Sequence, residues 1–372
     1  MQHVLLPALP MSSNAEAMKS STLSGDPATP ASHAAALSGE GTMDARPTIR
    51  RREAVAFTPW PAGTLPLLSR LYASRGADTP ELAQPRLADL HPPELMSGMQ
   101  GAVQLLTDAI AQDQRIVVVG DFDCDGATAC AVGVRGLRML GARHVAHAVP
   151  NRMVHGYGLS PALVEELATL QPDLLVTVDH GIACHAGVAA AKARGWKVLV
   201  TDHHLPGPAL PAADVIVDPN LHEDAFPSKS LAGVGVIFYV LLALRRHLRE
   251  RGVFADGKGP ELGSLLDLVA VGTVADLVVL DANNRALVNA GLRRLRSGQA
   301  CVGLKALIEA SGRDAARLTS TDIGFALGPR LNAAGRLEDM ALGIALLLTE
   351  DPRQARDIAQ TLEQINAERR AV

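Results

Sequence analysis

Residues 115–130 read R-I-V-V-V-G-D-F-D-C-D-G-A-T-A-C, and this stretch decides the fold. The four residues 116–119 are all β-branched, with polar sequence before them and a glycine after them. Such a run is typical of a strand that is buried on both faces, as strands of parallel sheets are. The stretch therefore predicts a buried strand of a parallel α/β sheet.

Three carboxylates follow this strand at every second position: Asp121, Asp123 and Asp125. Gly126 then permits a sharp turn, and we expect a helix over 127–140. Carboxylates at the carboxyl end of a parallel strand lie where α/β sheets place their active sites. Because three carboxylates this close repel one another, the pattern favours a site for a divalent cation.

Two other interpretations of these acids deserve comparison. D-x-D-x-D-G matches the first half of an EF-hand loop, but that loop needs a bidentate glutamate at its twelfth position, where this chain has Val132. The EF-hand also needs a preceding helix, and a strand is expected here. Ordinary solvated loop acids are the second alternative. A metal site at a strand end explains the position of the acids better than either.

Strand and helix signals alternate after this stretch, which predicts a parallel α/β sheet. Further strands are expected over 144–149, 174–178, 197–200 and 215–217, and helices over 161–170, 185–194 and 236–251. Beyond residue 252 the strand signals nearly stop. Helices are expected there over 262–271, 285–296, 302–310, 341–348 and 352–370, so the second half is predicted to be mainly helical.

The composition is that of an ordinary globular protein, with 48% hydrophobic and 20% charged residues among 372. A net charge of -4 excludes a global basic field for nucleic acid, so any such contact must be local. No apolar run reaches the ~18 residues of a membrane span, and we expect no signal peptide. The four cysteines form no C-x-x-C pair, which indicates reduced thiols and a cytoplasmic protein.

The chain ahead of the first strand divides into two parts. Residues 1–48 are rich in Ser, Ala, Thr, Pro and Gly without a periodic apolar face, and we expect this tail to be disordered. Residues 49–113 form a helical preface, with apolar residues at helical spacing over 65–75 and 95–112. The main domain is expected over 114–345.

Acids and imidazoles also follow two later strands. Asp179 and His180 come directly after 174–178, and Asp202, His203 and His204 come shortly after 197–200. One buried Asp or one satisfied His would be ordinary alone, but three strand ends that deliver them to one edge indicate a site. Carboxylates with a histidine suit Mn²⁺ or Mg²⁺ better than structural Zn²⁺. A shared carboxylate can bridge two ions ~3.5–4 Å apart, an arrangement used for phosphoester hydrolysis.

The triplet Asp202-His203-His204, with the acid loop and Asp179, resembles the DHH phosphoesterase superfamily. Its members include RecJ exonucleases, oligoribonucleases, cyclic-dinucleotide phosphodiesterases and a class of pyrophosphatases. Longer stretches resemble the RecJ branch in particular, from about residue 65 to the end. They are L-Y-A-S-R-G (71–76), V-V-G-D-F-D-C-D-G-A-T-A (118–129), N-R-M-V-H-G-Y-G-L-S (151–160), T-V-D-H-G-I (177–182), L-A-G-V-G-V (231–236), V-A-V-G-T-V-A-D-L-V-V-L (269–280) and G-P-R-L-N-A-A-G-R-L-E-D (328–339).

The resemblance implies a DHH catalytic domain over 114–345 that binds two Mn²⁺ or Mg²⁺ ions, with Asp179 bridging them. Asp121 is at the site but is expected to act through its neighbours. The implied metal residues are Asp121, Asp123, Asp125, Asp179, His203 and Asp276. Cys124 and His180 depart from the residues expected in relatives, and neither change removes a ligand.

The resemblance also implies catalytic and substrate-binding residues. His204 is expected to contact the scissile phosphate and assist proton transfer, Asp202 to orient the histidines, and Arg336 to hold phosphate through its planar fork of donors. The implied substrate-binding set is Arg152, His155, Tyr157, Arg330, Asn332 and Arg336. Structural roles remain the alternative for the 151–158 loop and for 328–339. Lys229, Gly233 and Gly235 border a helix N-terminus, where anion binding or helix packing is expected.

The activity implied by the resemblance is 5′ to 3′ hydrolysis of single-stranded DNA, releasing nucleotide 5′-phosphates, in DNA recombination and repair. A single-strand-binding protein and a helicase are the implied protein partners. A phosphodiesterase for very short oligonucleotides and a catalytically silent scaffold are the alternatives. Residues 346–372 resemble the start of a connecting helix, whose apolar side we expect to be exposed. The second domain with a G-G-H motif and the oligonucleotide-binding barrel that follow in RecJ proteins are expected to be absent.

Overall fold

The computed structural model describes residues 60, 63–152, 154–337 and 340–371, without the side chains of 336–337 and 370–371. The tail expected over 1–48 and the first residues of the preface lie outside this part of the chain. All of these described residues belong to one compact unit. None of the described helices is both long enough and apolar enough to cross a membrane. All four cysteines are free thiols.

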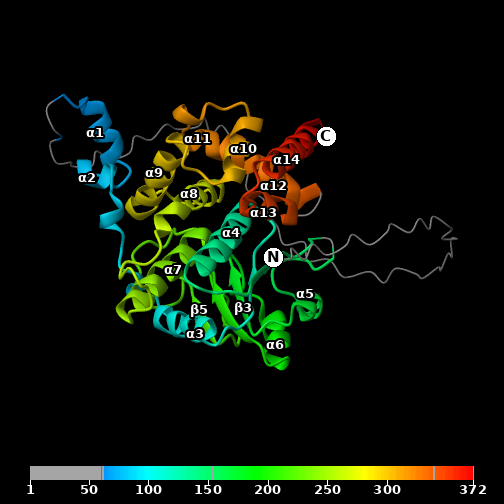
Figure 1. The fold of residues 1–372 in the computed structure, drawn as a ribbon. Coiled ribbons are helices and arrows are strands. Elements are labelled where there is room, and N and C mark those ends of the chain that lie inside the picture. Colours follow the sequence, from blue (N-terminus) through cyan, green and yellow to red (C-terminus); the bar gives the residue numbers. More distant parts are fainter. Residues whose placement is uncertain (1–59, 61–62, 153, 338–339, 372) are drawn as a thin grey trace, which may run out of the picture. The chain divides into compact units, whose positions relative to one another are not determined.

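The five predicted strands form one parallel sheet, which confirms the expected α/β class (Figure 1). They are β1 (Ile116–Val119), β2 (Val145–Ala148), β3 (Leu174–Val178), β4 (Lys197–Thr201) and β5 (Val215–Val217), in the spatial order β2-β1-β3-β4-β5. The chain leaves β1 for one edge of the sheet and returns on its other side as β3. Open α/β sheets bind ligands outside the carboxyl ends of strands at such a switch point, here between β1 and β3.

Helices cover both faces of the sheet because successive strand residues point to opposite sides. Val118 faces a core built with α3 (Met99–Ala111), α4 (Cys124–Met139) and α7 (Gly233–Glu250). Val117 and Val119 face a smaller core built with α5 (Pro161–Leu167) and α6 (His185–Ala193). Figure 1 shows α5 and α6 together on one side of the strands, with α3 and α7 on the other.

The second half is mainly helical, as predicted, and no strand follows β5 in the described residues. Its main helices are α8 (Leu266–Ala275), α9 (Ala282–Arg296), α10 (Val302–Ala310), α12 (Gly328–Leu337), α13 (Met340–Leu348) and α14 (Pro352–Ala371). A π-helical turn, Ile323–Leu327, leads into α12. Helix α4 joins the two halves, because it contacts the sheet and α7 as well as α8 and α13.

The helical preface agrees with the expectation, whereas the last helix packs differently from it. The preface helices α1 (Pro66–Ala73) and α3, which follows Gly98 in a left-handed conformation, lie within the two ranges expected to be helical, and the short helix α2 (Pro80–Ala83) lies between them. The apolar side of α14 was expected to be exposed, and this is wrong. Its residues Ala355, Ile358, Ala359, Leu362 and Ile365 are buried, and α14 contacts α10, α12 and α13.

The predicted turn at Gly126 is also wrong, because α4 begins at Cys124. Asp123 is the N-cap residue, and its Oδ1 accepts the Gly126 N–H at 2.9 Å. The glycine is needed for close approach instead. A Cβ atom at this position would lie 2.6 Å from the Asp121 backbone nitrogen and 2.7 Å from its Cα. The first turn of α4 is thereby held against the end of β1.

Contact between α4 and α7 should carry much of the stability of the domain. Leu241 of α7 is fully buried and lies over Gly136 of α4. We predict that Leu241→Ala lowers the free energy of unfolding by about 2–5 kcal/mol, the usual cost of such a cavity. Leu210→Ala is the matched control, since Leu210 is 48% exposed and its loss should cost within about 0.5 kcal/mol. Equal effects in denaturant unfolding would contradict this packing.

Candidate active site

The ends of β1, β3 and β4 bring their acids and imidazoles to one edge of the sheet, as the sequence predicted. Asp121, Asp125, Asp179 and Asp202 are all nearly or fully buried, with exposed fractions of 4% or less. Asp276 joins them from the end of α8, where it caps the helix. A buried carboxylate is costly unless it is hydrogen-bonded, protonated or bound to a cation. Each acid here therefore needs a partner.

Asp125 finds its partners at the N-terminus of α7. Its Oδ2 accepts the Gly233 N–H at 2.7 Å and its Oδ1 accepts the Val234 N–H at 3.1 Å. A Cβ on Gly233 would lie 2.5 Å from the Asp179 side chain, so only glycine fits here. The helix N-terminus expected to bind an anion is thus occupied by the protein's own carboxylate.

The two other residues proposed at this helix N-terminus are structural. The Lys229 ammonium donates to the carbonyls of Pro219 and Asp224, at 2.5 and 2.7 Å. Gly235 packs against Leu231, since a Cβ there would lie 2.6 Å from a Leu231 methyl carbon. Gly235 therefore permits close contact between α7 and the segment that leads into it.

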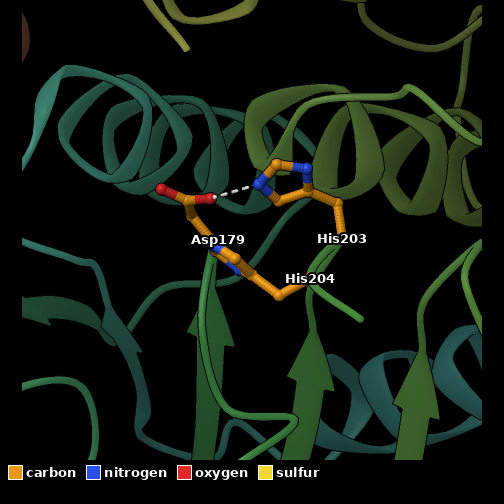
Figure 2. A group of neighbouring side chains, drawn as sticks. All are labelled: Asp179, His203 and His204. Atoms are coloured by element: carbon orange, nitrogen blue, oxygen red, sulfur yellow. Dashed lines mark ion pairs between the residues drawn. The ribbon is translucent and has the colours of Figure 1, made fainter. Parts of the chain in front are cut away.

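His203 lies between two acids and turns its ring toward Asp179 (Figure 2). Its Nε2 is 3.1 Å from Asp179 Oδ1 and 3.6 Å from Asp276 Oδ2. Within the described part of the chain, neither this Nε2 nor Asp179 Oδ1 has a hydrogen-bond partner of good geometry, although both atoms are buried. Asp179 also adopts φ +66°, a left-handed conformation that is unfavourable for a side-chain-bearing residue. Orphaned buried atoms of this kind fit a metal site.

Two groups of ligand atoms converge closely enough to hold a cation. One contains Asp179, His203 and His204, and the other contains Asp125, His203 and Asp276. His203 belongs to both, yet an imidazole nitrogen has one lone pair and cannot serve two ions. Burial lowers the pKa of His203 to about 4, so its ring is neutral near pH 7 and its lone pair is available. A protein side chain that bridged two ions would therefore have to be a carboxylate.

The acids of the site hold their protons unusually strongly. Burial, with repulsion from Asp123 and Asp202 added to it, raises the pKa of Asp121 to about 7, against the hydrogen bond from the Phe122 N–H. Burial and the charge of Asp123 raise the pKa of Asp276 to about 6. Burial and neighbouring acids raise the pKa values of Asp125 and Asp179 well above their usual range. A bound cation would lower the pKa values of these acids and favour their ionised forms.

Asp202 supports the two histidines. Its Oδ1 accepts the backbone N–H of His203 at 2.7 Å and contacts Nδ1 of the His204 ring at 2.7 Å, while its Oδ2 accepts the Ile182 N–H. This hydrogen bond with Asp202 raises the pKa of His204 to about 9. The His204 side chain is 47% exposed. It is therefore a cation with an accessible edge, suited to donate to an anionic group.

Tyr157 lies beside this histidine, and Phe122, which the sequence analysis did not assign, links Tyr157 to Arg152. Tyr157 meets the His204 ring edge-on at 6.5 Å and the Phe122 ring at 5.7 Å. The Arg152 guanidinium lies 5.1 Å from the centre of the Phe122 ring. Tyr157 is 51% exposed. In the sequence, Phe122 lies between Asp121 and Asp123, and this position in the first motif could have indicated that its ring lies at the site.

His155, in contrast, is turned into the protein. Only 8% of its side chain is exposed, its Nδ1 accepts the Asn151 N–H at 3.0 Å, and its Nε2 lies 3.1 Å from Glu166. The expectation that His155 faces the substrate is corrected, because both ring nitrogens brace the loop that carries Arg152 and Tyr157.

The motif at 328–339 also divides into different roles. Arg330 is 6% exposed, and its guanidinium is bound to Glu363 of α14 and to the Ala326 carbonyl, so the substrate contact expected of it is corrected. Asn332 Oδ1 accepts the Cys124 N–H at 2.7 Å and so caps the start of α4. The side chain of Arg336 lies outside the described residues.

A fourth strand end carries an acid that the sequence analysis missed. Asp218 follows β5 directly and is fully buried. Its Oδ1 accepts the Asn220 N–H at 2.7 Å. Burial raises the pKa of Asp218 to about 7. The signal was the same as for Asp179, an acid immediately after an expected strand.

We predict that the metal-free protein loses stability between pH 6.5 and 9. The folded pKa of His204, about 9, exceeds its ordinary value of 6.5, so its stabilisation is complete below pH 6.5 and disappears toward pH 9. The raised pKa of Asp121 acts in the same direction up to about pH 7, whereas the lowered pKa of His203 opposes it only between about pH 4 and 6.5. The melting temperature in EDTA should fall by at least about 2 °C across the window.

Two controls accompany this pH series. His204→Gln should flatten the fall above pH 7, because it removes the titrating group. Excess Mg²⁺ should reduce the fall, because a cation favours the ionised acids. A melting temperature that stays constant or rises from pH 6.5 to 9 would contradict the predicted electrostatics.

Comparison with known proteins is consistent with this geometry. The family model described as "DHH family, N-terminal domain" matches residues 115–273. The single-stranded-DNA-specific exonuclease RecJ of Dickeya dadantii (strain 3937) is 53% identical over 328 residues, which are 87% of this chain and 57% of that protein. The chain thus spans little more than half the length of this relative.

Two solved structures are similar in fold and sequence. The crystal structure of RecJ from Thermus thermophilus in complex with Mn²⁺ has a TM-score of 0.67 at 37% identity, covering 81% of this chain and 41% of that one. A crystal structure of exonuclease RecJ bound to manganese has a TM-score of 0.66 at 38% identity, covering 74% of this chain and 67% of that one. The chain belongs to the RecJ family of DHH proteins.

Proposed function

We propose that this chain hydrolyses phosphodiester bonds of single-stranded DNA from the 5′ end and requires two Mn²⁺ or Mg²⁺ ions. The observation that carries the proposal is the convergence of Asp125, Asp179, His203 and Asp276. Asp179 Oδ1 and His203 Nε2 are buried 3.1 Å apart, and neither has a hydrogen bond of good geometry within the described residues. RecJ relatives, which are named as single-stranded-DNA-specific exonucleases, support the substrate.

The proposed ligands are Asp123, Asp125, Asp179, His203 and Asp276, with Asp121 close by. Asp179 is the proposed bridge between the two ions. Its side chain lies beside His203 on one side and packs against Gly233 on the other, and the Gly233 N–H donates to Asp125. Two divalent ions held there would bind the scissile phosphate and lower the pKa of an attacking water. The raised pKa values of these acids support the assignment, since such a cluster ionises fully only with a cation present.

His204 is the proposed proton donor and phosphate contact. Its ring is cationic near pH 7 and half-exposed, and Asp202 holds one ring nitrogen so that the other is turned away from that carboxylate. A donor fixed in this way stabilises negative charge that develops on a phosphate oxygen. Arg336 is proposed as a second phosphate contact, on the strength of its motif and the planar fork of its guanidinium.

The strand itself is proposed to lie over Tyr157, Phe122 and Arg152. The two rings and the guanidinium form a continuous series next to His204. Aromatic faces stack on bases of any sequence, which suits an enzyme that digests a strand one nucleotide at a time. This local arrangement can bind nucleic acid although the net charge of the chain is -4.

The biological setting is proposed from the family. It comprises recombination and repair of DNA in the cytoplasm, with a single-strand-binding protein and a helicase as partners. Residues 114–345 are the proposed catalytic domain and 346–372 the proposed start of the connecting helix. The packing of α4 on both α8 and α13 supports a catalytic unit that includes the helical half.

The direct test is release of label from 5′-labelled single strands in Mn²⁺, with duplex of the same sequence as a comparison. Mononucleotide release from single strands alone is the expected result. Hydrolysis confined to strands of two to five nucleotides would establish the short-oligonucleotide alternative. Metal binding without hydrolysis of either substrate would establish the scaffold.

We predict that Asp125→Ala, Asp179→Ala and His203→Ala each lower the Mn²⁺ stoichiometry and slow hydrolysis by about 100-fold or more. The reason is that Asp125 and Asp179 each belong to one of the converging groups and His203 belongs to both. Calorimetry with Mn²⁺ checks the first effect and single-turnover cleavage the second. Glu309→Ala is the control, since Glu309 is an exposed acid on α10. An unchanged Mn²⁺ stoichiometry in all three variants would contradict the assignment of these residues as metal ligands.

We predict that Tyr157→Ala weakens single-strand binding by about 1–3 kcal/mol for the stacked base, with little change in the Mn²⁺ affinity. The exposed ring lies beside His204 without being among the groups that converge on a cation. Tyr157→Phe should bind within about twofold of the unmodified chain, because stacking needs the ring and not the hydroxyl. Fluorescence anisotropy with a labelled strand measures both. Equal losses in the two variants would point to the hydroxyl instead.

A further inference from the structure

A short loop after β5 lies behind His203. Asp202, at the end of β4, donates its backbone N–H to the Val217 carbonyl of β5, which keeps the two strand ends side by side. The chain then turns at Asp218, and Asn220 donates its side-chain amide to the His203 carbonyl at 2.5 Å. The loop thus holds the backbone of His203 through its carbonyl, while the Asp202 carboxylate accepts the His203 N–H.

Asp218 holds Asn220 in this position. Its Oδ1 accepts the Asn220 backbone N–H at 2.7 Å, and the residue is fully buried. Its Oδ2 has no hydrogen-bond partner among the described residues. Burying a carboxylate with one oxygen unbonded costs free energy. The hydrogen bond from the Asn220 N–H to the other oxygen offsets part of this cost and fixes the turn. His203 is therefore supported by two carboxylates, directly by Asp202 and through Asn220 by Asp218.

The same loop is tied to the preface. Asp224 Oδ2 accepts the Ser97 N–H at 2.6 Å, and its Oδ1 accepts the Phe226 N–H at 2.8 Å. Lys229 bonds the carbonyls of Asp224 and Pro219, the residue just before Asn220. Hydrogen bonds, together with the peptide bond between Pro219 and Asn220, thus connect the segment ahead of α3 to the backbone of His203.

We propose that Asn220 and Asp218 are positioning residues that set the affinity of the metal site to which His203 contributes. This inference rests on the proposed metal binding. His203 must hold its ring nitrogen between Asp179 and Asp276, which lie 3.1 and 3.6 Å away. Its backbone N–H is fixed by Asp202 and its carbonyl by Asn220. Groups that orient a ligand in this way commonly control metal affinity about 10–100-fold.

The experiment measures Mn²⁺ binding to the 372-residue chain by calorimetry, with the electron paramagnetic resonance signal of free Mn²⁺ as a second readout. Asn220→Ala should weaken binding at one site about 10–100-fold and leave the other within about twofold. Asn220→Asp keeps the shape but cannot donate, so it should also weaken that site. Asp218→Asn keeps an oxygen acceptor for the Asn220 N–H and should bind within about twofold of the unmodified chain, whereas Asp218→Ala should not.

Tyr239→Phe is the matched structural control. It removes one buried hydrogen bond, from the Tyr239 hydroxyl to Asn283, without contact with the His203 backbone. Melting temperatures in EDTA compare the general destabilisation of all variants. Mn²⁺ affinity that is unchanged in both Asn220 variants, or reduced equally by Tyr239→Phe, would overturn the inference. If the unmodified chain binds no Mn²⁺, the proposed function itself fails, and the two failures are thus distinguishable.

Discussion

The Asp125 carboxylate, held by the backbone N–H groups of Gly233 and Val234, is the interaction on which the site depends. It joins the first turn of α4, just after β1, to the N-terminus of α7, where the partial positive charge of the helix favours an anion. The same junction brings Gly233 against Asp179, at a distance that only glycine permits. Helix α4, whose first turn holds Asp125, also contacts α8 and α13 of the helical half. One buried carboxylate therefore links the sheet, α7 and the metal ligands.

Repulsion among the acids is the opposing constraint. The pKa values of Asp121, Asp125, Asp179 and Asp276 all lie above the usual carboxylate range, because these acids are buried near one another. A fold that keeps them together without a cation gives up stability, and groups perturbed in this way mark functional sites more often than structural ones. The hydrogen bonds around Asp202 and Asp125 fix the positions of the groups, while the remaining oxygens stay available to a cation.

Motif residues turned out to serve two purposes. Tyr157 and Arg152 extend the surface beside His204, whereas His155, from the same loop, braces it through Asn151 and Glu166. In 328–339, Arg330 joins α12 to α14, and Asn332 caps the start of α4. Polar residues in a motif thus include those that hold the site as well as those that face it. Spacing alone cannot separate the two classes, because both need fixed positions.

The sequence by itself determined the five strands, the parallel α/β class, the helical second half and the acids at the strand ends, because these follow from local runs and side-chain period. Only the tertiary structure decided which side chains meet. Gly126 proved to be a close-contact residue rather than a turn, α14 buried its apolar side, and Asp218 and Asn220 came to support His203. These contacts are set by how the strands, turns and helices come together in space, and the pattern of apolar residues along the chain does not specify the partner of a buried polar group.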